Sequence, residues 1–264
     1  MRALARPLVA TVVGTLWVSL FWFKPPGSWP QELGMSRRFV LSTVSAWTGL
    51  PGIWSWVVAS LVLGGLLPAV LLLLSSRQGT PSLLGPGSRA GWRLAGLAYL
   101  GALPFLWWLA SRPSFRDYYE PMLRGGLGGP AVRFVLVITA EHICIQGAVL
   151  RLALGVRPPW PALPLPMDHA SGWQRLAGAL GLAGAGGPAA RLGVDGRVLL
   201  ALGVQAWVFG WVHVSKDLGE LFLSFPGGLA LGYLAWRSRS VWPCVALHAA
   251  TGGSVIGLSY LLYG

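Results

Sequence analysis

Apolar stretches of the length that crosses a bilayer follow one another along this chain. A spanning helix needs about 17 to 25 predominantly apolar residues, and several stretches lie near the lower limit. Only 11% of the residues are charged, whereas a soluble domain carries about 25%. The sequence therefore predicts an all-α fold, a polytopic transmembrane helical bundle of about 7–8 spans. The expected spans are Leu8–Phe23, Ile53–Leu74, Trp92–Ala110, Val132–Leu154, Val198–Val214, Leu221–Trp236 and Val241–Tyr263, with Trp173–Ala185 as a partly inserted additional segment.

The connections between these spans indicate one membrane domain. Pro25–Gly52, Ser111–Ala131 and Gly155–Arg197 are long and rich in Pro and Gly, and none has the composition of a separate soluble domain. Lys24-Pro25-Pro26 follows the first apolar stretch where a signal peptide would have small residues, so we expect a retained first span.

The net charge of +12 bears on topology and partners. If the N-terminus is cytoplasmic, twelve of the 20 basic residues lie on the inner side and eight on the outer side, which favours that orientation. The expected partners of this charge are anionic headgroups of the lipid bilayer, and no nucleic acid is expected. The many Arg, Ala, Gly and Pro residues are typical of a GC-rich bacterial genome, so we expect a multi-pass protein of the bacterial cytoplasmic (inner) membrane.

Four ionisable residues within the apolar spans are the strongest pointer to function. Glu141 and His142 lie in the middle of one span, and His213 and His248 lie in two later ones. An acid at the centre of a membrane helix costs at least ~2.5 kcal/mol, so such residues usually face a bundle interior or a wet cavity and mark a working site. A carboxylate can activate water, an imidazole can stabilise developing charge, and the two together can bind a divalent metal. Simple pairing between helices is the alternative without chemistry.

Several familiar catalytic patterns are missing from the sequence. There is no HExxH, and Ile138 excludes HxxEH, so the zinc-protease motifs of soluble enzymes do not apply. There is also no GxSxG motif and no phosphate-binding loop. Cys144 and Cys244 have no CxxC spacing and are expected to be small buried hydrophobes.

Three motifs in order resemble those of the CAAX-processing and bacteriocin-processing (CPBP, or Abi) family of intramembrane endopeptidases. That family carries EExxxRG, then FxxxH, then a Gly-rich segment that leads to WP…LHxxxN. The corresponding stretches are Glu141–Gly147 (EHICIQG), Phe209–His213 (FGWVH), Phe225–Tyr233 (FPGGLALGY) and Trp242–His248 (WPCVALH). The resemblance implies that residues 132–264 are the CPBP-like catalytic core and that residues 1–131 add N-terminal transmembrane helices and loops.

The resemblance also implies a mechanism. Glu141 would activate water with help from His213, and His248 would help to stabilise the tetrahedral oxyanion. The site requires no cofactor, with zinc bound by Glu141, His213 and His248 as the alternative. The implied substrates are membrane-anchored polypeptides in bacterial protein processing or sorting.

Three positions depart from the family pattern. His142 stands where the family has its second Glu, and Gln146 stands where it has Arg. Gly252 takes the place of the Asn that follows the last His by four residues. His142 and Gln146 are four apart on one helix, so we expect a neutral hydrogen-bonded pair in place of an ion pair. Gly252 removes an oxyanion donor, and the candidate replacements are the hydroxyls of Thr251 and Ser254.

Two further expectations concern the surroundings of the site. Counting from the expected span ends, His248 lies one or two turns deeper than Glu141 and His213. Asp217 and Glu220, just after His213, are expected in a solvated loop. The rival functions are a catalytically degenerate CPBP-like membrane scaffold or immunity protein, and a redox or transport protein that uses intramembrane His.

Overall fold

The structure is a computed structural model that describes residues 2–20, 22, 35–76, 83–113, 128–155, 194–214, 216 and 218–263. All regular secondary structure within these ranges is helical. The elements are α1 (Arg2–Ser19), α2 (Met35–Thr48), α3 (Gly52–Ala59), η2 (Ser60–Leu66), α4 (Leu67–Ser76), α5 (Arg89–Ala110), α7 (Gly128–His142), η3 (Ile143–Val149), α8 (Leu150–Leu154), α11 (Gly196–Trp211), α12 (Leu218–Ser238) and α13 (Trp242–Tyr263). Here η2 and η3 are π-helical turns, each within a longer continuous helix.

The expected spans agree with these helices to within a few residues. Five helices of the described chain are long and apolar enough to cross a membrane: Gly52–Ser75, Arg89–Ala110, Gly128–Leu154, Leu218–Ser238 and Trp242–Leu262. Two shorter apolar helices, Ala5–Ser19 and Gly196–Trp211, correspond to the first and fifth expected spans. The helices therefore suggest a multi-pass membrane protein. The additional segment expected at Trp173–Ala185 lies outside the described residues.

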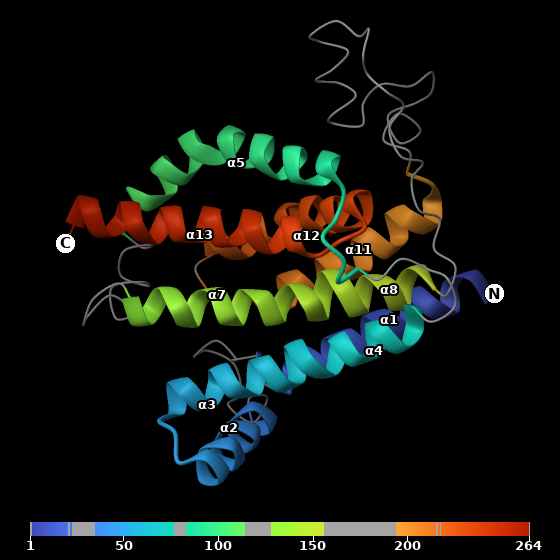
Figure 1. The fold of residues 1–264 in the computed structure, drawn as a ribbon, viewed down its shortest axis with the longest axis horizontal. Helices are drawn as coiled ribbons and strands as arrows, with labels where there is room; N and C mark the ends of the chain where they lie inside the picture. Colours follow the sequence, from blue (N-terminus) through green and yellow to red (C-terminus); the bar gives the residue numbers. More distant parts are fainter. Residues whose placement is uncertain are drawn as a thin grey trace, which may run out of the picture.

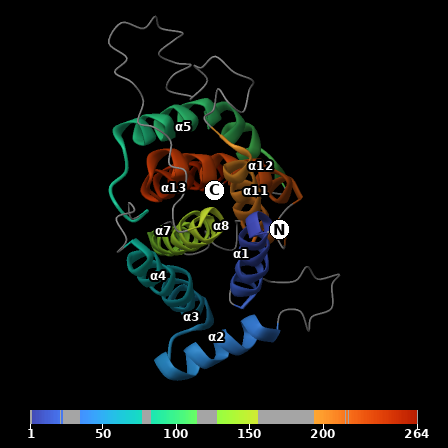
Figure 2. The same cartoon turned by 90° about the vertical axis from the view of Figure 1, so that its right-hand side faces the viewer.

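The long helices lie side by side in a bundle. Figure 1 shows α5, α13, α7–α8 and α3–α4 stacked from top to bottom with similar axis directions. The N-terminus and the C-terminus lie at opposite ends of this bundle. The end-on view in Figure 2 places α7–α8 in the middle, with α4, α1, α11 and α13 around it.

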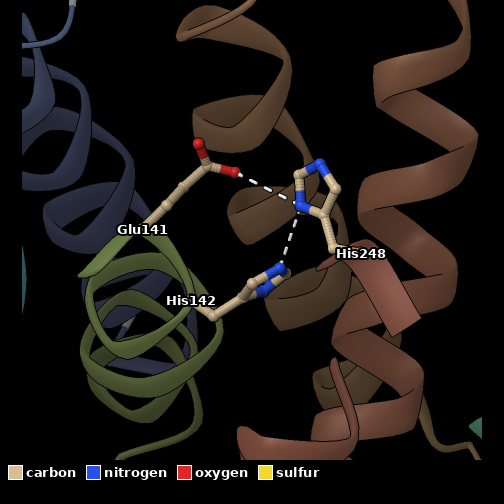
Figure 3. Close-up of side chains that lie close together, drawn as sticks. All are labelled: Glu141, His142 and His248. Atoms are coloured by element: carbon tan, nitrogen blue, oxygen red, sulfur yellow. Dashed lines mark hydrogen bonds and ion pairs between the residues drawn. The ribbon is translucent and has the colours of Figure 1, made fainter. Parts of the chain in front are cut away.

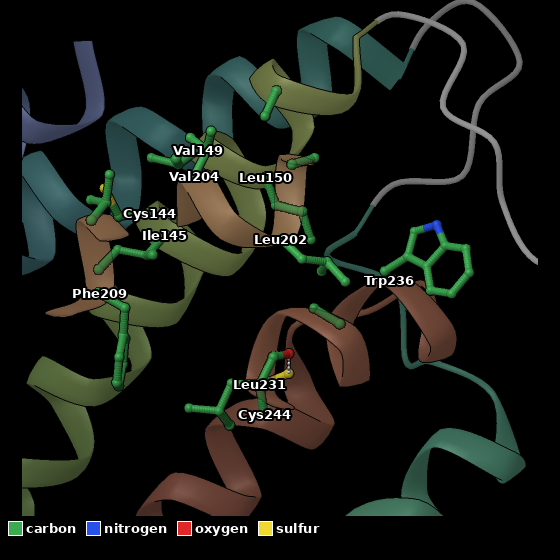
Figure 4. Close-up of a cluster of buried hydrophobic side chains, with 14 of the residues drawn as sticks. Cys144, Ile145, Val149, Leu150, Leu202, Val204, Phe209, Leu231, Trp236 and Cys244 are labelled. Atoms are coloured by element: carbon green, nitrogen blue, oxygen red, sulfur yellow. Dashed lines mark hydrogen bonds between the residues drawn. The ribbon is translucent and has the colours of Figure 1, made fainter. Parts of the chain in front are cut away.

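The central position of α7–α8 agrees with its burial. In the helix Gly128–Leu154, 72% of the apolar membrane-spanning stretch is buried inside the protein. The corresponding share is 17–39% in the other long helices. Its side chains Cys144, Ile145, Val149 and Leu150 join a buried cluster with residues of α11, α12 and α13, shown in Figure 4. The polar side chains of Glu141, His142 and Gln146 on this helix are accordingly buried within the protein.

The helix α2 was not expected, because it lies within Pro25–Gly52, which the sequence indicated only as a long Pro- and Gly-rich connection. Residues 35–48 contain neither Pro nor Gly, so nothing in their sequence prevents a helix. Gly49 follows with φ +68°, the left-handed conformation that commonly ends a helix and that Gly adopts most easily. The connection therefore contains a helix that the sequence did not indicate.

The turn between α12 and α13 sets where α13 begins. The backbone N–H of Val241 donates to the Leu83 carbonyl at 2.9 Å, and the indole N–H of Trp242 donates to the Leu84 carbonyl at 2.8 Å. The Ser240 hydroxyl donates to the Gly85 carbonyl at 2.5 Å. The segment before α5 therefore anchors the first turn of α13, the helix that carries His248.

Candidate active site

Glu141 and His142 occupy the last turn of α7, directly before the π-helical turn η3. Both side chains are buried, and His142 has no exposed surface. Isolated π-helical turns within α-helices are frequent at functional sites. The sequence singled out this pair, and the structure places it at the centre of the bundle.

His248 of α13 joins these two residues. Its Nδ1 lies 3.0 Å from Nε2 of His142 and 3.8 Å from Oε1 of Glu141, and Figure 3 shows the three side chains converging from α7 and α13. The prediction that His248 lies one or two turns deeper than Glu141 is therefore wrong. It assumed that all spans begin at one level, whereas the anchored turn before Trp242 fixes the start of α13 independently.

Glu141 is the member of this cluster with unused hydrogen-bonding capacity. Its Oε1 is buried and has no hydrogen-bond partner among the described residues. Buried carboxylate oxygens are normally hydrogen-bonded to protein or to ordered water. The 3.8 Å separation from His248 exceeds a hydrogen bond, so the oxygen has the environment of a group that binds water or substrate.

His213 lies beside the cluster rather than in it. The Phe209 ring packs against both imidazoles, with centroid distances of 4.6 Å to His213 and 5.7 Å to His248. Nδ1 of His213 donates to the Phe209 carbonyl at 2.8 Å, because a carbonyl only accepts. Its Nε2 faces Glu220 Oε1 at 3.7 Å.

Glu220 is not a solvated loop residue. It lies in the first turn of α12, its side chain is 16% exposed, and it pairs with Lys216 as well as with His213. That expectation was wrong because α12 already begins at Leu218 and its first turn brings this carboxylate back to His213. Asp217 lies outside the described residues.

His142 and Gln146 form the predicted neutral pair, with Nδ1 and Oε1 2.8 Å apart. The pair continues into Gln205, a residue that none of the sequence motifs includes. The Gln146 amide donates to Oε1 of Gln205 on α11 at 3.2 Å, and the Gln205 amide donates to the Gly228 carbonyl on α12. The available signal was a Gln within the apolar stretch Val198–Val214.

The place of the missing Asn side chain is filled by an aromatic ring. A Cβ on Gly252 would collide with the ring of Phe134, which comes from α7 and packs edge-on against His248. The Thr251 hydroxyl donates to the His248 carbonyl at 3.1 Å, and the Ser254 hydroxyl pairs with Tyr99 at 2.8 Å. Both hydroxyls thus have partners within the protein, and their replacement of the lost donor stays a prediction.

A divalent metal fits the cluster only after a small movement. One ligand atom each from Glu141, His142 and His248 lie within 4.8 Å of one another. Two nitrogens on one tetrahedral zinc ion would be about 3.3 Å apart, given Zn–N distances of 2.0–2.1 Å. The His142–His248 separation of 3.0 Å is instead that of a hydrogen bond. The donor set suits zinc, but it includes His142 rather than His213.

Comparison with known proteins identifies the region that carries this cluster. The family described as type II CAAX prenyl endopeptidase Rce1-like matches residues 130–253. No curated protein and no solved structure matches the chain. The matched region includes Glu141, His142, His213 and His248, and the cluster of Glu141, His142 and His248 is consistent with a catalytic site. Residues 130–253 are a domain of the Rce1-like type II CAAX prenyl endopeptidase (CPBP/Abi) family.

Proposed function

We propose that this chain is an intramembrane endopeptidase that cleaves membrane-anchored polypeptides with water activated by Glu141. The observation that carries the proposal is the convergence of Glu141 and His248 from two helices, 3.8 Å apart and largely buried, within a peptidase-family domain. Carboxylates at such depth are rarely retained without a role.

In the proposed reaction, Glu141 is the general base. Its free Oε1 accepts a proton from a bound water, and the water oxygen attacks the scissile carbonyl carbon. The protonated Glu141 then returns the proton to the leaving amine. The surrounding protein excludes bulk water, which strengthens each electrostatic interaction in the site.

His248 is the proposed stabiliser of the oxyanion. In its charged form, Nδ1–H donates to His142 with the Glu141 carboxylate 3.8 Å away, and Nε2–H is left for the oxyanion. Figure 3 shows this second nitrogen on the side of the ring away from His142. His213 lies next to the Phe209 ring with Glu220 as its partner, and we assign it a supporting role in orienting the water.

The proposed topology has seven spans, formed by the five long helices together with α1 and α11. An odd number of crossings agrees with termini at opposite ends of the bundle. We place the N-terminus in the cytoplasm and the protein in the bacterial inner membrane. Residues 1–131 form the N-terminal helices and loops, and residues 132–264 the catalytic core. The proposed reaction requires no cofactor, and zinc at Glu141, His142 and His248 is the alternative.

A comparison of terminal peptides tests this function. Host cells carry the wild-type chain, Glu141→Gln or the control Asp195→Asn at matched expression, and mass spectrometry identifies new protein termini in membrane and secreted fractions. Asp195 caps α11 through its carboxylate, and Asn is an equally good cap, so the control repeats the acid-to-amide change away from the site. We expect precursors to accumulate only with Glu141→Gln. Identical terminal peptides in all three strains would refute the peptidase.

A catalytically degenerate membrane scaffold or immunity protein is the second candidate. The observation in its favour is the Phe134 ring in the place of a donor side chain at Gly252. Loss of one oxyanion donor commonly costs ~10²–10³ in rate. If Glu141→Gln complements a deletion phenotype fully while termini stay unchanged, the scaffold is the better account.

A further inference from the structure

We infer that Gln205 and Gln146 are positioning residues that fix which nitrogen of His142, and through it of His248, carries the proton. The inference deepens the proposed function and rests on His248 acting in that site. Four side chains from three helices form the chain of hydrogen bonds: Gln205 (α11), Gln146 and His142 (the α7–η3 helix) and His248 (α13). Each bond determines the direction of the next.

Backbone carbonyl groups hold the Gln205 end of this series of hydrogen bonds. The Gln205 amide nitrogen lies against the Gly228 carbonyl and 3.3 Å from the Leu202 carbonyl. Carbonyls only accept, so this end of the side chain must be the NH₂ group and Oε1 must face the other way. Gly232 leaves room for this orientation, because a Cβ there would collide with the Gln205 amide.

Gln146 transmits this direction to His142. Since Gln205 presents Oε1, the facing atom of Gln146 must be its NH₂ group, 3.2 Å away. Gln146 Oε1 then accepts from Nδ1 of His142 at 2.8 Å. The proton of neutral His142 is therefore on Nδ1, and Nε2 carries the lone pair.

The last hydrogen bond of the series joins His142 to His248. Nε2 of His142 accepts from Nδ1 of His248 at 3.0 Å, so His248 keeps its Nδ1 proton in both its neutral and its charged form. Its Nε2 is the nitrogen left for water or substrate. Because Gln205, Gln146 and His142 have no exposed surface, solvent does not compete for these bonds.

This chain explains why a histidine can stand at position 142. A carboxylate at position 142 would accept a hydrogen bond from His248 with either of its oxygens, because ionised carboxylate oxygens only accept. An imidazole accepts only at the nitrogen without a proton. His142 can thus hold His248 only if another group keeps its proton on Nδ1, which is the task of Gln146 and Gln205.

The test is ¹⁵N NMR of the full-length protein labelled at histidine, in detergent micelles. The chain has four histidines, so signals are assigned with single-histidine variants. The coupling pattern of a neutral imidazole distinguishes Nδ1–H from Nε2–H. We expect wild-type His142 and His248 to be Nδ1–H. In Gln205→Leu, the Gln146 amide is free to rotate, and the tautomer ratio of His142 should shift by about fivefold, the equivalent of one hydrogen bond.

Two further variants guard against a folding artefact. Gly232→Ala displaces the Gln205 amide without removing it and should cause the same shift. Cys244→Ala removes a different buried contact to α12, from Sγ to the Leu231 carbonyl at 3.1 Å, and should leave both tautomers unchanged.

The inference is overturned if wild-type His248 carries its proton on Nε2, or if Gln205→Leu and Gly232→Ala both leave the tautomers of His142 and His248 unchanged. This readout does not depend on proteolysis. A failed terminal-peptide comparison with the expected tautomer shifts would refute the peptidase alone, and the reverse pattern would refute the positioning role alone.

Discussion

Replacing the neutral pair His142–Gln146 by the family's Glu and Arg, one position at a time, tests whether the two positions depend on each other energetically. His142→Glu places a carboxylate where the structure has a fully buried neutral ring. The new carboxylate can still accept a hydrogen bond from His248. It also faces Oε1 of Gln146, which in the wild type accepts from Nδ1 of His142 at 2.8 Å, so two acceptors would meet. Rotating the Gln146 amide only moves the conflict to Gln205, whose orientation is held by the Gly228 carbonyl.

The expected cost follows from this geometry. A buried charge without a partner destabilises a protein by ~3–5 kcal/mol, a large part of a total stability of about 5–15 kcal/mol. The second carboxylate, Glu141, approaches the same nitrogen of His248 that position 142 contacts, and it adds repulsion. Gln146→Arg would supply the missing cation and can still donate to Gln205 Oε1. We therefore expect a coupling energy of about 2–3 kcal/mol between the two substitutions.

The assay is equilibrium unfolding in mixed micelles with increasing SDS, for the wild type, both single variants and the double variant. Cys144 and Cys244 are buried, so their reaction with a thiol reagent reports unfolding. His142→Gln, which adds no charge, is the control and should cost about 1–2 kcal/mol. A coupling energy below about 0.5 kcal/mol, the value for independent sites, would refute the reasoning.

Three other predictions concern neighbouring positions. Gly252→Asn alone should destabilise the protein by about 1–3 kcal/mol because the side chain meets the Phe134 ring, and Phe134→Ala should relieve this and raise the rate at which substrate is processed; a double variant no more stable than Gly252→Asn would contradict this. Gly87→Ala should lower the stability by about 1–3 kcal/mol and reduce processing, because φ is +82° and the new Cβ would lie 2.9 Å from Cβ of Ser240. The control Gly96→Ala, in α5, has open space around the new Cβ and should be neutral or stabilising in the same unfolding assay. Asp195→Ala should lower stability by about 1 kcal/mol through loss of the α11 cap, and equal unfolding midpoints for this variant and Asp195→Asn would exclude a capping role.

The spans and the first motif could be predicted from sequence because both depend on local properties. Hydropathy and length identify membrane-spanning helices within a few residues, as the agreement between Trp92–Ala110 and α5 illustrates. The His142–Gln146 hydrogen bond is also local, since residues four apart on one helix face each other. The unexpected helix α2 was hidden by the Pro and Gly residues on either side of it.

The contacts between helices were decided only by the tertiary structure. Gln205 and Phe134 complete the site from positions that no motif marks, and the level of His248 depends on the anchored turn before α13. Sequence specifies which residues share a helix face, because the rise and rotation of a helix are constant. Which faces meet, and at what height, follows from packing and loop contacts between segments distant in the chain, and these determined how one carboxylate and two histidines come within reach of one another.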